Sequence, residues 1–461
     1  MRYPAYPRYK PSGIEWLGDV PEQWEVKRIK HLVSYRVSNV DKIPSEDELP
    51  IRLCNYTDVY NNDFITPKLD LMETTATVEE IRRFGLQKGD VIITKDSEDW
   101  RDIAVPALVT ETAPDLVCGY HLAILRAHRN VLRSDYLLRA FQSFAINHQF
   151  QLSAGGVTRF GLPKSSIGES LIPLPDLSEQ KAIAAFLDYQ TKRIDMLVAK
   201  KRELIERLKE KRTALISQTV TRGLPPDAAR AAGLDPYPTL KPSGIEWLGE
   251  IPEHWEIIEL RRFTNFITSG SRGWAEYYSD EGSIFIRIGN LTRSSIDIDL
   301  SDVQYVTPPT GSEGERTRIR NGDILFSITA YLGSVAVAEE SITGAYINQH
   351  IALVRVDHSR LEPRYVAYST LGDIGQLQLS GLGYGGTKIQ LSLDDVLSLR
   401  FCIPPIDEQR TIAAYLDKET AKIDALIAKV EEAIERLQEY RTALITAAVT
   451  GKIDVREKEM P

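Results

Sequence analysis

A glycine-rich segment in the second half of the chain has the letters of a phosphate-binding loop. It reads "GLGYGGTK" over 381–388. Such a loop needs a lysine followed by Ser or Thr at the start of a helix, because the ammonium group and the hydroxyl must reach the phosphates and their Mg²⁺ together. Here Thr387 precedes Lys388, so the order is reversed. The segment does not predict nucleotide binding.

A second segment, "PDLSEQK" at 175–181, contains the carboxylates and the lysine that a nuclease site would use. Its acidic residues stand at the start of a predicted helix, where Glu179 complements the helix dipole. The matching segment later in the chain has Pro405 in place of Asp176. The segment therefore indicates a helix start and not a catalytic centre.

The residues for other catalytic chemistry are missing as well. The seven histidines are scattered without the spacing of a metal site. The sequence contains no Asn-Pro-Pro-Tyr-like tetrapeptide of a methyltransferase and no cofactor-binding glycine loop. We therefore expect no catalytic site, no metal and no cofactor in this chain.

If the chain binds DNA, the candidate contacts are loops that combine glycine with Arg, Asn, Lys or Thr. Arginine pairs with guanine and asparagine with adenine, and glycine allows a loop to approach a backbone closely. The second half offers "TSGSRGW", "IRIGN" and "YGGTK", and in the first half "TKDSEDWRDIAVPA" is unlike its counterpart "SITAYLGSVAVA". Ordinary loop structure is the competing explanation for each residue. The candidate DNA-contacting residues are Asn55, Tyr56, Lys95, Asp96, Trp100, Arg101, Thr158, Arg159, Ser271, Arg272, Arg287, Asn290, Thr387 and Lys388.

The elements that must position these loops occur twice. The phrase "PSGIEWLG" begins at Pro11 and again, letter for letter, at Pro242. Its aromatic and aliphatic residues provide apolar area for docking, and its glycines provide turns. We expect each copy to be a lead-in that packs its domain against the helix that ends the previous half. The competing expectation is a local cap on its own domain.

A long segment without Gly or Pro closes each half, beginning with "SEQKAIAAFLD" at Ser178 and "DEQRTIAAYLD" at Asp407. Richness in Ala, Leu, Glu, Lys and Arg predicts a helix in both cases. Ser178 and Asp407 are the expected N-caps, and Gly223 and Gly451 the expected stops. The two halves therefore have the same ending.

Apolar residues in both helices recur three and four positions apart, which is the seam of a coiled coil. The seam is continuous in the second helix, whereas Lys201, Lys211 and Gln218 interrupt it in the first. We expect the two helices to pair antiparallel; the alternative is that each packs only on its own domain. The predicted seam residues are Ile194, Leu197, Leu204, Leu208, Leu215, Ile423, Leu426, Val430, Leu437 and Leu444.

Between lead-in and helix, the two halves share only landmarks. These are a Gly-Asp pair at 89–90 and 322–323, and a histidine before an apolar run, His121 and His350. Short apolar runs such as "DVIIT", "GDILFSI" and "IALVRV" predict strands between polar loops. Each middle is therefore expected to be a mixed α/β domain, one frame carrying two different surfaces.

Composition limits the class of protein. The 461 residues are 43% hydrophobic and 26% charged, and no apolar run approaches the roughly 20 residues of a membrane span. The N-terminus lacks a signal-peptide core, and three isolated cysteines suit a reducing cytoplasm. The net charge of -9 disfavours a simple DNA binder, although "KRIKH" at 27–31 and "ERTRIR" at 315–320 are locally basic.

The chain resembles the DNA-specificity subunits of type I restriction-modification systems over nearly its whole length. The most specific part is "EQ..IA..LD..T..ID.L..K....IERL.E.R.ALI...VTG", complete at 408–451 and almost complete at 179–223, where Arg222 replaces the expected glycine. "GIEWLGxxPExWE" and the junctions "PLPDLSEQ" and "IPPIDEQ" also resemble that family.

The resemblance implies an α+β architecture of two target-recognition domains in pseudo-two-fold tandem, separated by two long helices that form an antiparallel coiled coil. The expected parts are a lead-in over 1–25, recognition domain 1 over 26–176, a central spacer helix region over 177–222, a linker and second lead-in over 223–255, recognition domain 2 over 256–405, a C-terminal spacer helix region over 406–451, and a tail over 452–461.

The resemblance further implies a non-catalytic cytoplasmic subunit that reads a bipartite, asymmetric site in double-stranded DNA. Its partners would be two methyltransferase subunits and, through the complex, restriction subunits. A helical spacer of about 30 residues spans about 45 Å, or on the order of 13 base pairs. Two alternatives stand: a coiled-coil scaffold that binds protein, and a specificity subunit of a related system with fused nuclease and methyltransferase.

Overall fold

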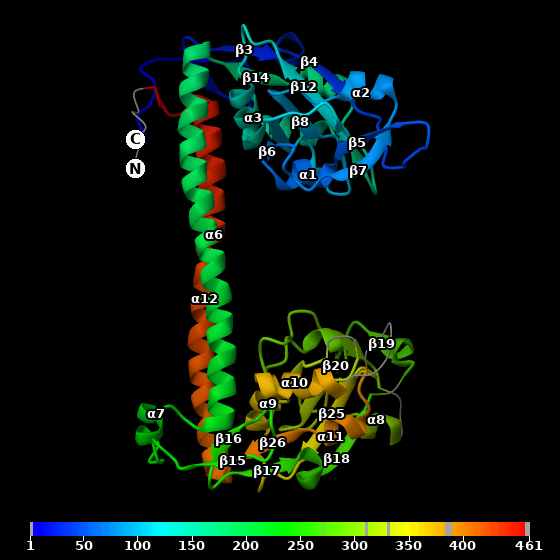
Figure 1. Cartoon of the computed structure of the whole chain (residues 1–461), viewed down its shortest axis with the longest axis vertical. Helices are drawn as coiled ribbons and strands as arrows, with labels where there is room; N and C mark the ends of the chain where they lie inside the picture. Colours follow the sequence, from blue (N-terminus) through cyan, green and yellow to red (C-terminus); the bar gives the residue numbers. More distant parts are fainter. Residues whose placement is uncertain (1–2, 271, 309–311, 330–331, 383–389, 457–461) are drawn as a thin grey trace. The chain divides into compact units, whose positions relative to one another are not determined.

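The computed structural model describes residues 3–270, 272–308, 312–329, 332–382 and 390–456. The chain forms two compact units, Met1–Lys201 with Glu431–Pro461, and Arg202–Val430. Each unit holds one α/β domain, one lead-in and a stretch of both long helices, α6 (Leu177–Arg222) and α12 (Ile406–Val449). The tandem α/β organisation with two long helices that the sequence predicts is therefore confirmed (Figure 1).

The first α/β domain has a five-stranded sheet in the order β4-β12-β8-β10-β6 and a three-stranded sheet in the order β11-β5-β7. The strands of the larger sheet are β4 (Val33–Val37), β6 (Phe64–Ile65), β8 (Asp90–Thr94), β10 (Pro106–Val109) and β12 (Leu122–Ala127); those of the smaller are β5 (Leu49–Cys54), β7 (Met72–Ala76) and β11 (Leu116–Cys118). The helices are α1 (Tyr56–Asn61), α2 (Val78–Phe84), α3 (Ser134–Gln142), α4 (Phe144–Ser153) and α5 (Lys164–Glu169).

The second α/β domain has two four-stranded sheets, in the orders β18-β25-β22-β23 and β19-β21-β20-β24. Their strands are β18 (Thr264–Ser269), β22 (Ile324–Ser327), β23 (Val335–Val337) and β25 (Ile351–Val356), and β19 (Tyr278–Ser279), β20 (Ser283–Ile286), β21 (Gln304–Val306) and β24 (Tyr346–Ile347). The helices are α8 (Ser312–Arg316), α9 (Pro363–Leu371), α10 (Asp373–Leu382) and α11 (Leu393–Leu397).

Short two-stranded sheets join the start of each domain to its end. Strand β3 (Glu25–Arg28) pairs with β14 (Leu171–Leu174), and β17 (Glu256–Glu259) pairs with β26 (Arg400–Ile403). The lead-ins are hairpins of β1 (Tyr9–Pro11) with β2 (Asp19–Pro21) and of β15 (Leu240–Pro242) with β16 (Glu250–Pro252), β9 (Asp96–Ser97) pairs with β13 (Phe160–Gly161), and α7 (Pro226–Ala231) lies in the linker.

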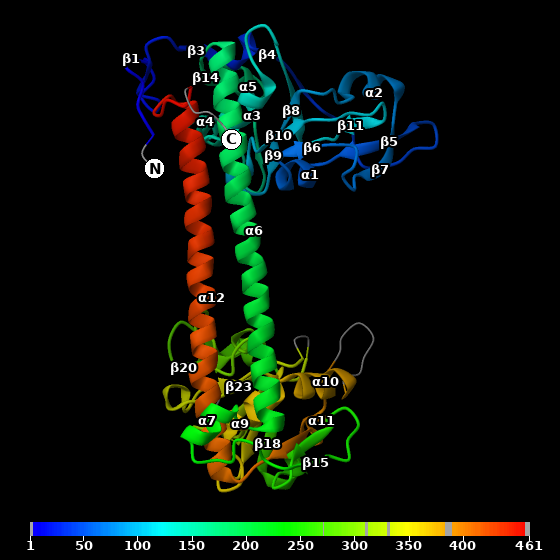
Figure 2. The same cartoon turned by 60° about the vertical axis from the view of Figure 1, so that its left-hand side comes forward.

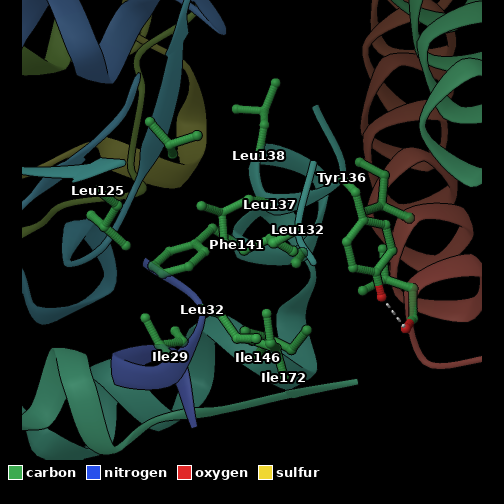
Figure 3. Close-up of a cluster of buried hydrophobic side chains, with 14 of the residues drawn as sticks. Ile29, Leu32, Leu125, Leu132, Tyr136, Leu137, Leu138, Phe141, Ile146 and Ile172 are labelled. Atoms are coloured by element: carbon green, nitrogen blue, oxygen red, sulfur yellow. Dashed lines mark hydrogen bonds between the residues drawn. The ribbon is translucent and has the colours of Figure 1, made fainter. Parts of the chain in front are cut away.

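The core of the first unit lies between the five-stranded sheet and α3. Leu125 on β12 and Leu137 and Phe141 on α3 are fully buried there (Figure 3). Tyr136 faces the end of α12, where its hydroxyl lies 3.5 Å from Val449 O. The same hydroxyl donates to Pro173 O at 2.9 Å. The same buried cluster includes Val449, so the domain core continues into the long helix.

The repeated Gly-Asp pair closes an equivalent turn in both domains. Asp90 is buried and accepts from Arg126 through both carboxylate oxygens, each at 2.7 Å. Asp323 accepts from Arg355 in the same way, at 2.8 and 2.7 Å. A charged, two-pronged hydrogen bond of this kind holds neighbouring strands in register. The landmark therefore marks the frame that the two domains share.

The glutamine of the repeated "EQ" anchors each long helix to its domain. Gln180 donates to Val131 O and Pro175 O and accepts from Arg133 N, at 3.0, 2.8 and 2.8 Å. Gln409 makes the equivalent bonds with Arg360 O, Pro404 O and Glu362 N. Both glutamines are fully buried, and their amides satisfy backbone groups just before α3 in the first domain and just before α9 in the second.

The cap of the first long helix differs from the expectation. The helix begins at Leu177, and Asp176, not Ser178, accepts from Glu179 N at 2.8 Å. The Ser178 hydroxyl instead donates to the Asp176 carboxylate at 2.6 Å. A carboxylate is as good an N-cap as a hydroxyl, and the sequence offered both within three positions.

Each lead-in packs against the end of a long helix, as one of the two sequence interpretations expected. Trp255 is fully buried in a cluster with Ile216 and Val220 near the end of α6, and its indole donates to Glu408 at 3.1 Å. In the other unit, Trp24 is buried in a cluster with Val449 at the end of α12. The lead-in thus links a domain to the helix from the other half of the chain.

The two long helices run antiparallel within each unit. Arg212 Nε lies 3.1 Å from Asp424 Oδ1, and further along α6 Val220 shares a cluster with Leu416, which precedes Asp424 on α12. In the other unit Arg441 Nε lies 3.1 Å from Asp195 Oδ1. Both views show the helices side by side (Figures 1 and 2).

The predicted seam is right in period but displaced by one residue at alternate positions. Ile194, Leu208, Ile423, Val430 and Leu444 are buried, and Leu215 and Leu437 are partly buried. The prediction is wrong for Leu197, Leu204 and Leu426, which are 49%, 43% and 45% exposed. Their neighbours Val198, Ile205 and Ile427 are more buried.

The reason for this error is the adjacent apolar pairs at 197–198, 204–205 and 426–427. A three-four alternation can pass through either member of such a pair, and the packing partner decides between them. The polar residues that interrupt the seam of the first helix also differ from those predicted. Lys211 and Gln218 are exposed, and Arg212 and Thr219 are the buried residues beside them.

Candidate nucleic-acid interface

Several candidate residues lie together in the loops at one edge of the first domain's large sheet. These loops, called the loop ring below, are the segment after β8 and the segment 155–161. Strand β8 ends at Thr94, and the chain continues into Lys95 and β9. The pairing of β9 with β13 brings the loop 155–161 alongside. Gly155 and Gly161 exchange two backbone hydrogen bonds, of 3.1 and 2.9 Å, so this loop is closed at its base.

Three charged side chains and a histidine form a chain of contacts across these loops. Lys95 Nζ lies 2.7 Å from Asp96 Oδ1, and His121 Nδ1 lies 2.8 Å from Asp96 Oδ2. Arg159 Nη2 donates to His121 Nε2 at 2.7 Å. The structure therefore brings together Lys95, Asp96 and Arg159, which the sequence singled out separately.

The charge of Asp96 is stabilised by its neighbours. Burial raises the pKa of this carboxyl, but hydrogen bonds from Lys95 and His121 outweigh burial and hold the pKa below its usual value. Asp96 is therefore an acceptor at neutral pH. Gly161 makes room for it, because a Cβ at that position would lie 2.9 Å from Asp96 Oδ1.

Aromatic side chains border the cluster. The Tyr56 hydroxyl lies 3.1 Å from Ser97 Oγ, and its ring stacks on Tyr60 with centroids 5.8 Å apart. Trp100 is exposed, and Arg101, also exposed, pairs with Asp99 at 2.5 Å. Exposed rings beside cations are typical of surfaces that contact nucleic acid.

Two further candidates of the first domain lie in different surroundings. Thr158 is exposed on the closed loop beside Arg159. Asn55 is buried at the start of α1, where its backbone N–H donates to Asp58 at 2.7 Å. Asn55 therefore supports the helix start and is not at the surface for base contact.

In the second domain, Asn290 is part of the loop frame. It is 4% exposed, its Oδ1 accepts from Arg287 N at 2.8 Å, and its amide donates to Asp299 O and Asp302 O. These bonds occupy the groups with which asparagine would recognise adenine. The expectation of base contact from Asn290 is therefore not supported by its surroundings.

Of the remaining candidates in the second domain, Arg287 belongs to the same loop frame as Asn290. Arg287 pairs with Asp302 at 2.7 Å and lies at the rim of a cavity of about 350 Å³. Arg272 is exposed. Ser271, Thr387 and Lys388 lie outside the described residues.

The tandem frame and its unlike loops are matched by a family model described as "Type I restriction modification DNA specificity domain". The match occurs twice, over 21–207 and 252–436, and so covers most of the chain. The chain belongs to this family.

Two relatives of this specificity-family chain match over nearly its whole length, and a third matches over about two thirds of it. The MjaX type I restriction enzyme specificity subunit of Methanocaldococcus jannaschii is 24% identical over 444 residues, covering 95% of this chain and 96% of the relative. The MjaVIII specificity subunit of the same organism is 22% identical, with coverage of 95% and 94%. The EcoBI specificity subunit of Escherichia coli is 23% identical over 307 residues, 65% of this chain and 62% of the relative.

A solved structure has the same fold. It is described as the structural basis underlying complex assembly and conformational transition of the type I R-M system, and it matches with a TM-score of 0.65 and 20% identity, over 93% of this chain and 98% of the other. The family match and the tandem fold together give this chain the role of a type I restriction-modification specificity subunit.

His121 is a landmark of the sequence of this specificity subunit, but it is not among the predicted site residues. Its backbone has φ +69. Among the described residues other than glycine, Ala104 is the one other residue with a positive φ. Such left-handed backbone is costly for a residue with a Cβ and is found at functional sites. No pattern of residue types indicates it, because φ is set by the fold.

The equivalent histidine of the second domain has different neighbours. His350 Nδ1 lies 2.8 Å from Thr329 Oγ1, and His350 Nε2 lies 3.3 Å from the Gln349 amide. The position that Asp96 occupies in the first domain thus has a hydroxyl counterpart here. The two domains therefore share a frame but differ in the polar group beside the histidine, a carboxylate in the first domain and a hydroxyl in the second.

The described parts of the chain contain neither a candidate metal site nor a candidate membrane-spanning helix. Within those ranges, no group of three or more His, Cys, Asp or Glu side chains is placed to hold a metal ion. Among the same residues, none of the helices combines the length and the apolar character that crossing a bilayer would require.

Proposed function

We propose that each recognition domain of this chain reads one half of a bipartite, asymmetric site in double-stranded DNA. The observation that carries the proposal is the contrast between frame and loops. The frames repeat, down to the Asp90–Arg126 and Asp323–Arg355 pairs. At equivalent strand ends, however, Asp96 stands in one domain and Thr329 in the other.

The candidate DNA surface of the first domain is the loop ring with Tyr56, Lys95, Asp96, Trp100, Arg101, Thr158 and Arg159. Direct readout needs donors and acceptors that reach base edges, and this set has both. In the second domain the candidates are Arg272 and Arg287, with Ser271, Thr387 and Lys388 on segments outside the described residues.

The long helices have two proposed roles. As a paired spacer they would set the gap between the half-sites, and as a surface they would dock two methyltransferase subunits. Leu197, Leu204 and Leu426, which are exposed, provide apolar area for such docking. Restriction subunits would join through the complex, and the assembly would work in the cytoplasm.

The proposal assigns no chemistry to this chain itself. Methylation of adenine and cleavage of DNA would be supplied by the partner subunits, which the specificity subunit directs to their site. The net charge of -9 is compatible with this role, because a subunit covered by partners needs to be basic only where DNA lies.

The experiment that tests the proposal is a domain exchange in the complete complex. Methylated adenines are mapped in cells that carry the chain with its partner subunits, before and after residues 26–150 are replaced by those of another family member. We expect one half of the recognised sequence to change and the other half and the gap to remain. A change in both halves would show that the domains do not read independently.

A salt titration separates this proposal from a coiled-coil protein scaffold. Duplex affinity of a DNA reader falls steeply as salt rises, because phosphate contacts release counterions. A protein scaffold would show no preference for duplex DNA at any salt concentration, and that result would exclude DNA reading.

A further inference from the structure

We propose that His121 is a positioning residue that aims Arg159 at a base in the first half-site, and that it can do so only while its imidazole is neutral. This inference rests on the proposed function, because it assigns a role within the same DNA-reading surface. The observations that carry it are two hydrogen bonds on one ring, a left-handed backbone and a closed glycine loop.

The two hydrogen bonds define one tautomer. Arginine has only donors, so His121 Nε2 must accept from Arg159 Nη2 across 2.7 Å. The ionised Asp96 has only acceptors, so His121 Nδ1 must carry the proton at the 2.8 Å contact. A ring with its proton on Nδ1 satisfies both neighbours, whereas a doubly protonated ring loses its acceptor for Arg159.

The contact leaves Arg159 available to DNA. A guanidinium group has five N–H donors in a planar fork, and the bond to His121 engages one nitrogen. The Arg159 side chain is exposed on the loop surface. Restricting its rotation beforehand reduces the entropy lost when the remaining donors meet the two acceptors of a guanine edge.

The surrounding backbone is built to hold this arrangement. His121 keeps φ +69, and its carbonyl accepts from Lys95 N at 2.7 Å. On the facing loop, a Cβ on Gly156 would lie 1.9 Å from Arg159 O, so the turn that presents Arg159 requires glycine there. Two separate segments are therefore fixed in the conformations that bring the ring and the guanidinium together.

Charged and titratable groups meet the ring from each packed element. Asp96 on β9 and Arg159 on the facing loop bond to the ring, and the centroid of the Tyr120 ring is 3.8 Å away. Lys95, which precedes β9, is linked to the ring through its ion pair with Asp96. When His121 gains a proton, a cation would stand 2.7 Å from the Arg159 guanidinium and would repel it. We therefore expect readout by the first domain to weaken as pH falls.

The test uses the full chain in its complex with the partner subunits, on duplexes that carry the mapped site. Affinity is measured for the cognate duplex and for single-base changes in each half-site, from about pH 8 to about pH 5, where histidine changes its charge. For the unmodified chain we expect discrimination at one base pair of the first half-site to fall by up to roughly ten-fold when the His121 ring is doubly protonated. Discrimination in the second half-site serves as the internal reference.

Two substitutions at the same position separate aiming from folding. His121→Asn tolerates left-handed backbone and keeps a donor for Asp96, but it is too short to accept from Arg159. We expect it to lose discrimination at the same base pair as Arg159→Ala, at every pH. His121→Gln can place an amide oxygen near the position of Nε2, so it should retain discrimination without the pH dependence. His148→Gln, at another histidine of the same domain, should match the unmodified chain.

The outcomes distinguish this inference from the proposed function. If no bipartite duplex is bound above non-specific DNA, the proposed function fails. If a bipartite site is bound but His121→Asn and Arg159→Ala affect different base pairs, or neither, the aiming role is overturned. An unmodified chain whose discrimination does not change with pH would overturn the requirement for a neutral ring.

Discussion

Arg212 on α6 and Asp424 on α12 form an ion pair of 3.1 Å, and Arg441 and Asp195 repeat it at 3.1 Å in the other unit. The pairs are equivalent positions of the internal repeat, with the roles of the two helices exchanged. The Arg212 side chain is 9% exposed and Asp424 49%. Each unit thus uses the same charged contact to set the register of its helix pair.

Removing the acceptor should destabilise the helix pair. Asp424→Asn leaves the buried guanidinium of Arg212 without its counter-charge, and we expect a loss of about 1–2 kcal/mol in the free energy of unfolding, below that of a fully buried pair because Asp424 is half-exposed. Urea unfolding and hydrogen exchange of the α6 amides measure it. Glu203→Gln, at an exposed pair within one helix, should cost less than about 0.5 kcal/mol. Equal effects of both substitutions would contradict the prediction.

The buried tryptophan of the second lead-in should matter more than the exposed one. Trp255→Ala removes a fully buried indole and its bond to Glu408, and we expect a loss of about 3–5 kcal/mol together with faster proteolysis of the linker at 223–241. Trp247 is 40% exposed, and its replacement by Ala should cost about 1 kcal/mol or less. Limited proteolysis of both variants is the measurement, and identical cleavage rates would show that packing of the lead-in against α6 does not protect the linker.

Asn290 should be needed for stability and not for sequence readout. Its amide bonds to three backbone groups, and Asn290→Ala leaves Arg287 N and Asp299 O without these bonds, whereas Asp302 O keeps a bond from Arg287 Nη2. The substitution should cost roughly 2–4 kcal/mol. The mapped methylation sequence should not change at a temperature where the variant is folded. Arg272→Ala, at an exposed side chain, is the matched opposite: unchanged thermal unfolding and weaker DNA binding are expected. A changed recognition sequence in Asn290→Ala would restore it as a base-contacting residue.

Cleavage of the linker should leave the two chain halves associated. Both α6 and α12 contribute to each compact unit, so a cut between 223 and 241 does not remove the contacts of residues 202–222 with residues 406–430. A sizing column under native conditions should show the nicked chain eluting with the uncut chain. Elution as two separate fragments would show that the helix contacts do not hold without the connection.

The repeats, the frame and the family resemblance could all be read from residue types. Helix-forming residues without Gly or Pro over more than 40 positions leave little choice but a helix, and the structure has α6 and α12 there. The Gly-Asp landmark indicated that both domains share a feature. Its cause, the two-pronged bond to Arg126 or Arg355, depends on strand pairing between distant segments.

Local pattern determined the period of the helix seam, the positions of the lead-ins and the tandem plan, because these depend on neighbours along the chain. The tertiary structure alone decided which of two adjacent apolar residues, such as Leu197 and Val198, faces the partner helix. It also decided that Arg159 meets His121, 38 residues away. Contacts of this kind depend on how β9, β13 and their loops pack, and many sequences of the same composition would leave those side chains apart.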